Sequence, residues 1–131
     1  MPGISRSANH ILVVDDEAIL RMSLTDDLRQ SGYDVDEAGN GRVALACMRR
    51  RVPHLVLLDL RMPIMNGFSF RAEQRQDPLL ASVPVILISA NGEEENARSL
   101  GAAGVLDKPV QFPKLIAMIN SLHRANGLET T

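Results

Sequence analysis

The sequence predicts an α/β fold, a doubly wound parallel sheet of five strands with helices on both faces. Three continuous apolar runs, each the length of a strand buried on both faces, carry this prediction: Ile11–Val14, Leu55–Leu58 and Val85–Ile88. Segments with helical spacing separate the runs, and the connections are short enough for βαβ units. We find no internal repeat and no sign of a second domain in the sequence.

The first half of the chain is predicted to form two strands and two helices. Leucines recur every fourth residue after the first strand and predict the apolar stripe of a helix that ends near Gly32. These leucines are Leu20, Leu24 and Leu28. Tyr33–Glu37 is predicted to be a short edge strand, because aspartates alternate there with apolar residues. A turn at Gly39–Gly41 leads into a helix that continues through Met48.

Prolines precede the next two buried strands. Pro53 comes before Leu55–Leu58, a strand that ends at Asp59, and Pro84 comes before Val85–Ile88, which ends at Ser89. A helix that reaches about Gln76 is expected between them, after a loop that contains Pro63 and Gly67.

The last part of the chain completes the alternation. A weak helix is expected over Glu93–Leu100, followed by a short strand around Val105–Leu106. The final helix is indicated by apolar residues at i, i+3 and i+4 spacing: Leu115, Ile116, Ile119 and Leu122. The sequence therefore predicts five strands that alternate with five helices.

Length and composition limit the classes of protein that fit. The 131 residues suit one domain, which we place at residues 10–125, with flexible segments at 1–9 and 126–131. The net charge of −2 gives no electrostatic footprint for nucleic acid, so we expect no direct nucleic-acid binding. The apolar runs are far shorter than the roughly 20 residues that span a bilayer. With no apolar signal-peptide stretch at the start, we expect no membrane insertion and a cytoplasmic location.

Several conspicuous residues have a structural interpretation. Cys47 is the only cysteine, so we expect no disulfide and no cysteine metal site, and we interpret it as a small buried hydrophobe. The basic run Arg49–Arg51 is interpreted as the solvated end of a helix. The histidines show no metal-ligand spacing and are expected to be structural or exposed; they are His10, His54 and His123.

Polar side chains follow the predicted strands at the points where the strands end. Asp15 and Asp16 follow the first strand, Asp59 the third, Ser89 the fourth and Lys108 the fifth. Ligands of open parallel sheets bind beyond the carboxyl ends of the strands. We therefore expect these side chains to gather at one edge of the sheet.

The expected chemistry is phosphoryl acceptance by a carboxylate. Three carboxylates at close range repel one another unless a cation lies among them, and Mg²⁺, or Mn²⁺ in its place, prefers oxygen ligands and phosphate. Asp16 and Asp59 are the best direct ligands, and Asp15 binds directly or through water. A carboxylate can also act as a nucleophile and form an aspartyl phosphate. Lys108 would add positive charge and Ser89 a hydrogen bond.

Each of these residues also has a plain structural interpretation. Asp15 and Asp16 could form only the N-cap of a helix, Asp59 could begin a turn, and Lys108 could lie on the surface. It is the joint placement of all of them at strand ends that favours a site.

At this point the sequence resembles the receiver domain of bacterial response regulators, from two-component signalling. The resemblance spans about Asn9 to Ala125. It depends on the motifs ILVVDDE (residues 11–17), LVLLDLRMP (55–63), MNG (65–67), SA (89–90), GA (101–102) and KP (108–109).

The resemblance implies a flavodoxin-like (βα)5 fold with the strand order 2-1-3-4-5. It further implies transfer of a phosphoryl group from a kinase phosphohistidine to Asp59. It also implies that the backbone carbonyl of Arg61 binds the metal and that Ser89 moves toward the phosphoryl group. Lys108 matches the family's lysine, and its bond to Pro109 is expected to be cis.

Four departures from the family pattern lie away from this pocket. Val105 replaces the usual aromatic residue, Ala103–Gly104 replaces paired acidic residues, and Val110 replaces a common phenylalanine. The span Asn91–Leu100 is also shorter than usual by almost a helical turn. We therefore expect the chemistry to be retained while the usual switch is not, with Ser89 ordering Asn91–Leu100 on phosphorylation. Arg61 and Asn91 are candidates for tuning the lifetime of the phosphate.

The function predicted from sequence is a phosphoryl-accepting receiver that catalyses only its own phosphorylation and dephosphorylation. Its expected partners are a histidine kinase or histidine phosphotransfer protein and an unidentified downstream protein. Alternatives are a receiver cut from a hybrid histidine kinase or larger regulator, and a pseudo-receiver that serves only as a binding scaffold. A small-molecule phosphatase fits less well, because the sequence has neither a phosphate-binding glycine loop nor the Asp-x-Asp spacing of aspartyl phosphatases.

Overall fold

All five strands of the predicted sheet are present and run parallel. The computed structural model describes residues 9–60, 65–90 and 99–125. The strands are β1 (His10–Val14), β2 (Asp34–Ala38), β3 (Leu55–Asp59), β4 (Val85–Ser89) and β5 (Gly104–Asp107). Their order across the sheet is β2-β1-β3-β4-β5, which confirms the predicted flavodoxin-like topology.

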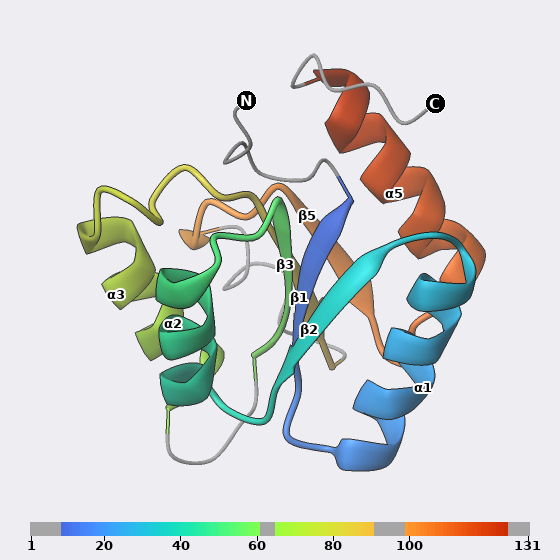
Figure 1. Ribbon diagram of the computed structural model, residues 1–131, viewed down its shortest axis with the longest axis horizontal. Helices are drawn as coiled ribbons and strands as arrows, with labels where there is room; N and C mark the ends of the chain where they lie inside the picture. The colour runs from blue at the N-terminus through green and yellow to red at the C-terminus, as the bar shows by residue number, and fades with distance from the viewer. Residues whose placement is uncertain (1–8, 61–64, 91–98, 126–131) are drawn as a thin grey trace.

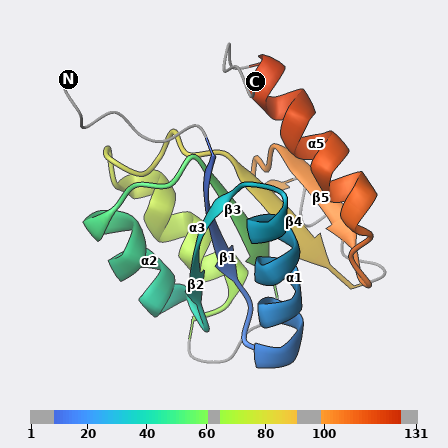
Figure 2. The same cartoon turned by 45° about the vertical axis from the view of Figure 1, so that its right-hand side comes forward.

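Helices cover both faces of the sheet. Those within the described ranges are α1 (Ala18–Gln30), α2 (Gly41–Arg50), α3 (Gly67–Gln76) and α5 (Phe112–Ala125). Figures 1 and 2 show α1 and α5 on one face and α2 and α3 on the other. Most of the predicted helix at Glu93–Leu100 lies outside the described residues. Residues 126–131, and all but Asn9 of the segment 1–9 that is predicted to be flexible, also lie outside them. No helix among the described residues has the length and apolar content to cross a membrane.

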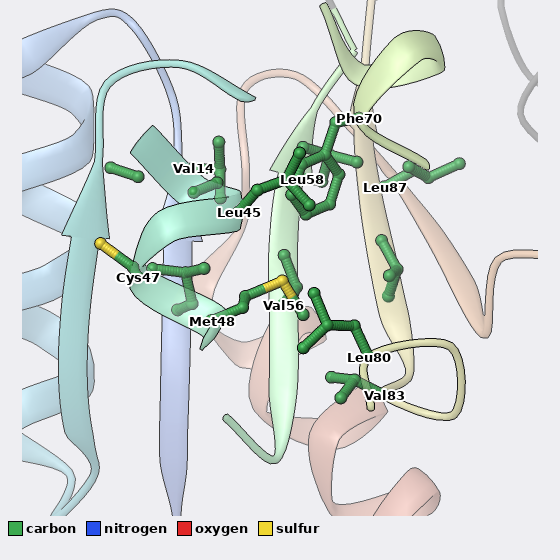
Figure 3. Close-up of a cluster of buried hydrophobic side chains, with 14 of the residues drawn as sticks. Val14, Leu45, Cys47, Met48, Val56, Leu58, Phe70, Leu80, Val83 and Leu87 are labelled. Carbon is green, nitrogen blue, oxygen red and sulfur yellow. The ribbon is translucent and has the colours of Figure 1, made fainter. Parts of the chain in front are cut away.

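Alternate residues of the buried strands supply two separate apolar cores. Val14, Val56 and Leu58 face α2 and α3, where they pack with Leu45 and Phe70 (Figure 3). Ile11, Val13, Leu57 and Ile88 belong to the second core, which they share with residues of α1 and α5 such as Leu28 and Leu115. Because both faces of each strand are buried, the strands are continuously apolar, which is why their sequence runs were easy to recognise.

The bounds of two elements and the exposure of one side chain differ from the prediction. β2 begins at Asp34 and ends at Ala38, one residue later at each end, because Ala38 still pairs with Val14. α2 continues to Arg50. Leu20, predicted to belong to the buried stripe of α1, is 50% exposed and lines a cavity of about 370 Å³ beside Lys108.

The structural interpretations of the remaining residues are confirmed. Cys47 is buried, and so are His10, His54 and His123. The basic run does end a helix. Two of its arginines also form ion pairs, Arg49 with Asp77 and Arg51 with Asp34.

The start of α3 is fixed directly against the end of β3. A Cβ atom on Gly67 would lie 2.8 Å from the Cα of Leu60 and 3.0 Å from the carbonyl oxygen of Asp59, so only glycine fits this approach. The Gly67 N–H also donates to the Leu60 carbonyl at 3.1 Å. One residue earlier, Asn66 caps α3 by accepting from the Ser69 N–H at 2.9 Å. The strand end that carries Asp59 is therefore held in place.

Candidate functional site

Three aspartates meet at the carboxyl ends of β1 and β3. Each of Asp15, Asp16 and Asp59 offers a carboxylate oxygen, and these oxygens lie within 4.8 Å of one another. Asp59, the last residue of β3, is 1% exposed and Asp15 is 5% exposed, whereas Asp16 lies on the surface. The sheet thus brings together the three carboxylates that the strand-end pattern predicted.

Asp15 is held by contacts on both its backbone and its side chain. Its N–H donates to the carbonyl of Ala38 at the end of β2, over 3.1 Å. Its Oδ1 accepts from the N–H of Glu17 over 2.9 Å. Glu17, not Asp15 or Asp16, occupies the N-cap position of α1, and the side chain of Glu17 makes no capping bond. The interpretation of the aspartate pair as a helix N-cap is therefore wrong.

Burial and charge crowding change the protonation of Asp15. Desolvation, with a further contribution from the negative charge of Asp59, raises the pKa of Asp15 from its ordinary 3.8 to about 6. The Glu17 N–H and the Lys108 ammonium oppose this increase without cancelling it. The charged form of Asp15 is thus destabilised in the absence of a cation, as expected of an acidic cluster that holds a metal.

Lys108 supplies the positive charge inside the cluster. It follows β5, and its N–H donates to the Ser89 carbonyl at 2.9 Å. Its Nζ lies 3.1 Å from Asp59 Oδ2 and 3.8 Å from Glu17 Oε1. Burial lowers the pKa of Lys108, but the bond to Asp59 and the surrounding carboxylates raise it more, so that it lies above the ordinary value. The predicted cis peptide bond between Lys108 and Pro109 is confirmed.

Ser89 ends β4 on the same edge of the sheet and is 1% exposed. Within the described ranges, its hydroxyl makes no hydrogen bond. A buried hydroxyl without a partner is unfavourable by about 1–3 kcal/mol. This donor is therefore available to a group that enters the pocket.

Two of the predicted site residues lie outside the described residues, and two residues that contact the site were not among the predicted ones. Arg61 and Asn91 lie outside the described residues, as does most of the Asn91–Leu100 segment assigned to the order–disorder switch. Glu17 and Arg21 contact the site but carried no signal of their own in the sequence, because each reaches it only through the folded β1–α1 connection. Val105 is half-buried and packs against the core that faces α2 and α3.

The donor set fits a hard divalent cation. All three carboxylates offer oxygen ligands at mutually short distances. Burial, with a smaller contribution from the charge of Asp59, raises the pKa of Asp15, so a bound cation would favour its charged form. Mg²⁺ characteristically binds one or two carboxylates together with phosphate oxygens and water.

The parallel sheet thus carries an acidic cluster and a lysine together at its carboxyl edge. The family model described as "Response regulator receiver domain" matches residues 11–120. The chain therefore belongs to the response regulator receiver domain family.

Named relatives agree with this assignment. The chain is 34% identical over 120 residues to the phosphate regulon transcriptional regulatory protein PhoB of Pseudomonas aeruginosa, covering 89% of this chain and 52% of that protein. It is 34% identical over 119 residues to the probable chemotaxis protein CheY of Rhizobium etli, covering 88% and 92%. The signal receiver domain of a signal transduction histidine kinase from Syntrophus aciditrophicus superimposes with a TM-score of 0.81 at 28% identity, covering 94% of both chains. The chain spans about half the length of several of its curated relatives.

The raised pKa of Asp15 gives a prediction for stability. Because the folded protein binds this proton more tightly than the unfolded chain, the free energy of unfolding should fall as pH rises from about 4 to about 6 in chelator. Above that range the charged carboxylate is unfavourable, so Asp15→Asn should raise the melting temperature at pH 7.5 by about 3–6 °C, or about 1 kcal/mol after allowance for solvent screening.

Circular dichroism melts in EDTA measure this effect, with the exposed Asp26→Asn as the matched control, expected to leave the melting temperature unchanged. A lower melting temperature for Asp15→Asn would contradict the electrostatic account of the cluster.

Proposed function

We propose that Asp59 accepts a phosphoryl group from the phosphohistidine of a histidine kinase or histidine phosphotransfer protein. The observation that carries the proposal is the setting of this carboxylate. It is 1% exposed, lies beside two further aspartates, and is bonded to Lys108 at 3.1 Å. A buried carboxylate in such a setting is suited to act as a nucleophile toward a phosphoryl group whose negative charge is offset by a divalent cation.

The transfer needs only the phosphohistidine of the donor and the carboxylate of Asp59 as reactants. A carboxylate oxygen of Asp59 forms a bond to phosphorus as the bond from phosphorus to the imidazole nitrogen of the donor breaks. The imidazole keeps the electron pair of that bond and takes up a proton as solution pH requires. The product on this chain is an acyl phosphate, and attack by water at phosphorus later restores the carboxylate. The chain therefore promotes only its own phosphorylation and dephosphorylation.

Two side chains of the pocket have separate roles in this proposal. Lys108 already contacts Asp59 and can pair with a phosphoryl oxygen once that oxygen enters the pocket. The hydroxyl of Ser89, which has no partner among the described residues, can donate to another phosphoryl oxygen.

The carboxylates of Asp15, Asp16 and Asp59 would hold Mg²⁺, or Mn²⁺ in its place. When bound, the cation neutralises negative charge on the phosphoryl oxygens. The carbonyl of Arg61 remains the predicted additional ligand.

The output of the domain is proposed to be a protein contact. Some relatives are named transcriptional regulators and one a probable chemotaxis protein, so relatives of this kind include more than one output. The chain spans about half the length of several of these relatives, so we do not assign the activities of those longer proteins to this chain. The absence of direct nucleic-acid binding and a cytoplasmic location remain predictions.

Phosphorylation of Asp59 can be tested by mass. Incubation with Mg²⁺ and acetyl phosphate should add one phosphoryl group to the wild-type chain, and chelation of the Mg²⁺ should prevent the addition. Asp59→Asn should abolish the adduct, because the amide is not a nucleophile of this kind. Asp107→Asn, which changes an exposed carboxylate at the end of β5, is the matched control and should keep the adduct.

The other outcomes distinguish the alternatives. A wild-type chain that forms no adduct with acetyl phosphate or with a phosphorylated histidine kinase would favour the scaffold. Hydrolysis of acetyl phosphate without an adduct would favour a phosphatase.

A second prediction concerns Ser89. Ser89→Ala should raise the free energy of unfolding by about 1–3 kcal/mol, because it removes a buried hydroxyl that has no partner among the described residues. It should weaken binding of the phosphoryl mimic beryllofluoride about tenfold, because a hydrogen bond to a charged group is lost. Titration calorimetry with Mg²⁺ present measures the binding.

Thr25→Val is the control, since the Thr25 hydroxyl is also buried without a partner among the described residues but belongs to α1. Equal beryllofluoride affinity in Ser89→Ala and wild type would refute the role of Ser89.

A further inference from the structure

Arg21, on the first turns of α1, joins three parts of the fold next to the acidic cluster. Its Nη1 donates to the backbone carbonyl of Asp15 at 2.6 Å. Its Nε donates to Glu37 Oε1 at 3.1 Å. The side chains of Arg21 and Glu37 are only 20% and 29% exposed, so both bonds are partly protected from solvent.

Glu37 gives the guanidinium a fixed position. It lies in β2, where its Cα pairs with Val13 of β1, two residues before Asp15. A Cβ atom on Gly39 would lie 3.5 Å from Arg21 Nη1, so the turn after β2 also packs closely against the guanidinium. Arg21 is thus held by β2 on one side while it bonds the β1–α1 connection on the other.

The backbone N–H and the backbone carbonyl of Asp15 are therefore both held by β2, the first directly and the second through Arg21. The N–H of Asp15 donates to Ala38, the last residue of β2, and its carbonyl accepts from Arg21, which Glu37 of β2 orients. With Oδ1 engaged by the Glu17 N–H, the carboxylate is constrained toward Asp16 and Asp59.

The contact that Arg21 makes with Asp15, through Nη1, is to the backbone carbonyl oxygen and not to a carboxylate of the acidic cluster. An arginine that bound a carboxylate would compete with a metal ion, whereas one that binds the carbonyl beneath it can orient the carboxylate without that competition.

We propose that Arg21 is a positioning residue for divalent-cation binding: through its bonds to the Asp15 carbonyl and to Glu37, it holds the Asp15–Asp16 connection in the geometry that binds the metal. The inference rests on the proposed function, because it concerns the same cation site. A merely structural ion pair of this exposure would contribute little to stability and would not alter metal affinity.

The test compares two arginines of the same helix. Arg21→Lys keeps the positive charge but loses the planar fork that reaches two acceptors at once. Arg29→Lys is the matched control, because Arg29 Nη2 also donates to a backbone carbonyl of β2, that of Val35 at 2.9 Å, away from the cluster. The dissociation constant for Mg²⁺ is measured on the full chain by titration calorimetry, and melting in EDTA is measured alongside.

Arg21→Lys is expected to weaken Mg²⁺ binding about tenfold, as loss of an outer-shell contact does elsewhere, while Arg29→Lys leaves the dissociation constant unchanged. The melting temperatures of the two variants in EDTA are expected to fall by similar amounts, because each variant alters one arginine bond to a backbone carbonyl. Mg²⁺ affinity in Arg21→Lys within twofold of wild type, or equal weakening by Arg29→Lys, would overturn the inference.

A second pair of variants separates the Glu37 contact. Glu37→Gln keeps an oxygen that can accept from Arg21 Nε, whereas Glu37→Ala removes it. Glu37→Ala should weaken Mg²⁺ binding in the wild-type background and add little in Arg21→Lys, because the two side chains act as one unit. If the losses in the free energy of Mg²⁺ binding from Glu37→Ala and Arg21→Lys simply add in the double variant, the two side chains do not act as one unit. A wild-type chain that binds no Mg²⁺ would reject the proposed cation site and this inference together, whereas normal binding in every variant would reject only the role of Arg21.

Discussion

Repulsion among three carboxylates is the constraint on which the arrangement of this domain depends. A parallel sheet brings the carboxyl ends of its strands to one edge, and β1 and β3 are neighbours, so the side chains that follow them are forced together. The cost appears in Asp15, whose pKa is raised to about 6 by desolvation and by the charge of Asp59. Lys108 offsets part of this charge through its bond to Asp59.

The surrounding backbone keeps the charged groups close despite their repulsion. Gly67 lets the start of α3 pack on the end of β3, and the bonds of Asp15 to Ala38 and Glu17 fix the end of β1. On the face where the family usually has an aromatic residue, half-buried Val105 packs into the core instead. There the buried Arg71 of α3 donates to the carbonyls of Leu100 and Gly101, which connects α3 with the turn before β5.

The sequence predicted the features that depend on local pattern. Buried strands such as Leu55–Asp59 are continuously apolar, and the polar residue at the end of each is conspicuous, so the sheet and the meeting of Asp15, Asp16 and Asp59 could be inferred. Features that depend on how one helix lies against the sheet could not be inferred from the sequence. The exposure of Leu20 and the bond of Arg21 to Glu37 follow from how α1 lies against β2, which helical spacing alone does not specify. The roles of the individual site residues remain predictions.

The most direct test of the central claim is the dependence of stability on Mg²⁺. If the carboxylates form a cation site, the free energy of unfolding should rise with Mg²⁺ concentration and, above the dissociation constant, gain about 1.4 kcal/mol for each tenfold increase. Urea unfolding at constant ionic strength, followed by circular dichroism, measures this dependence. A free energy of unfolding that is the same in EDTA and in millimolar Mg²⁺ would contradict the account.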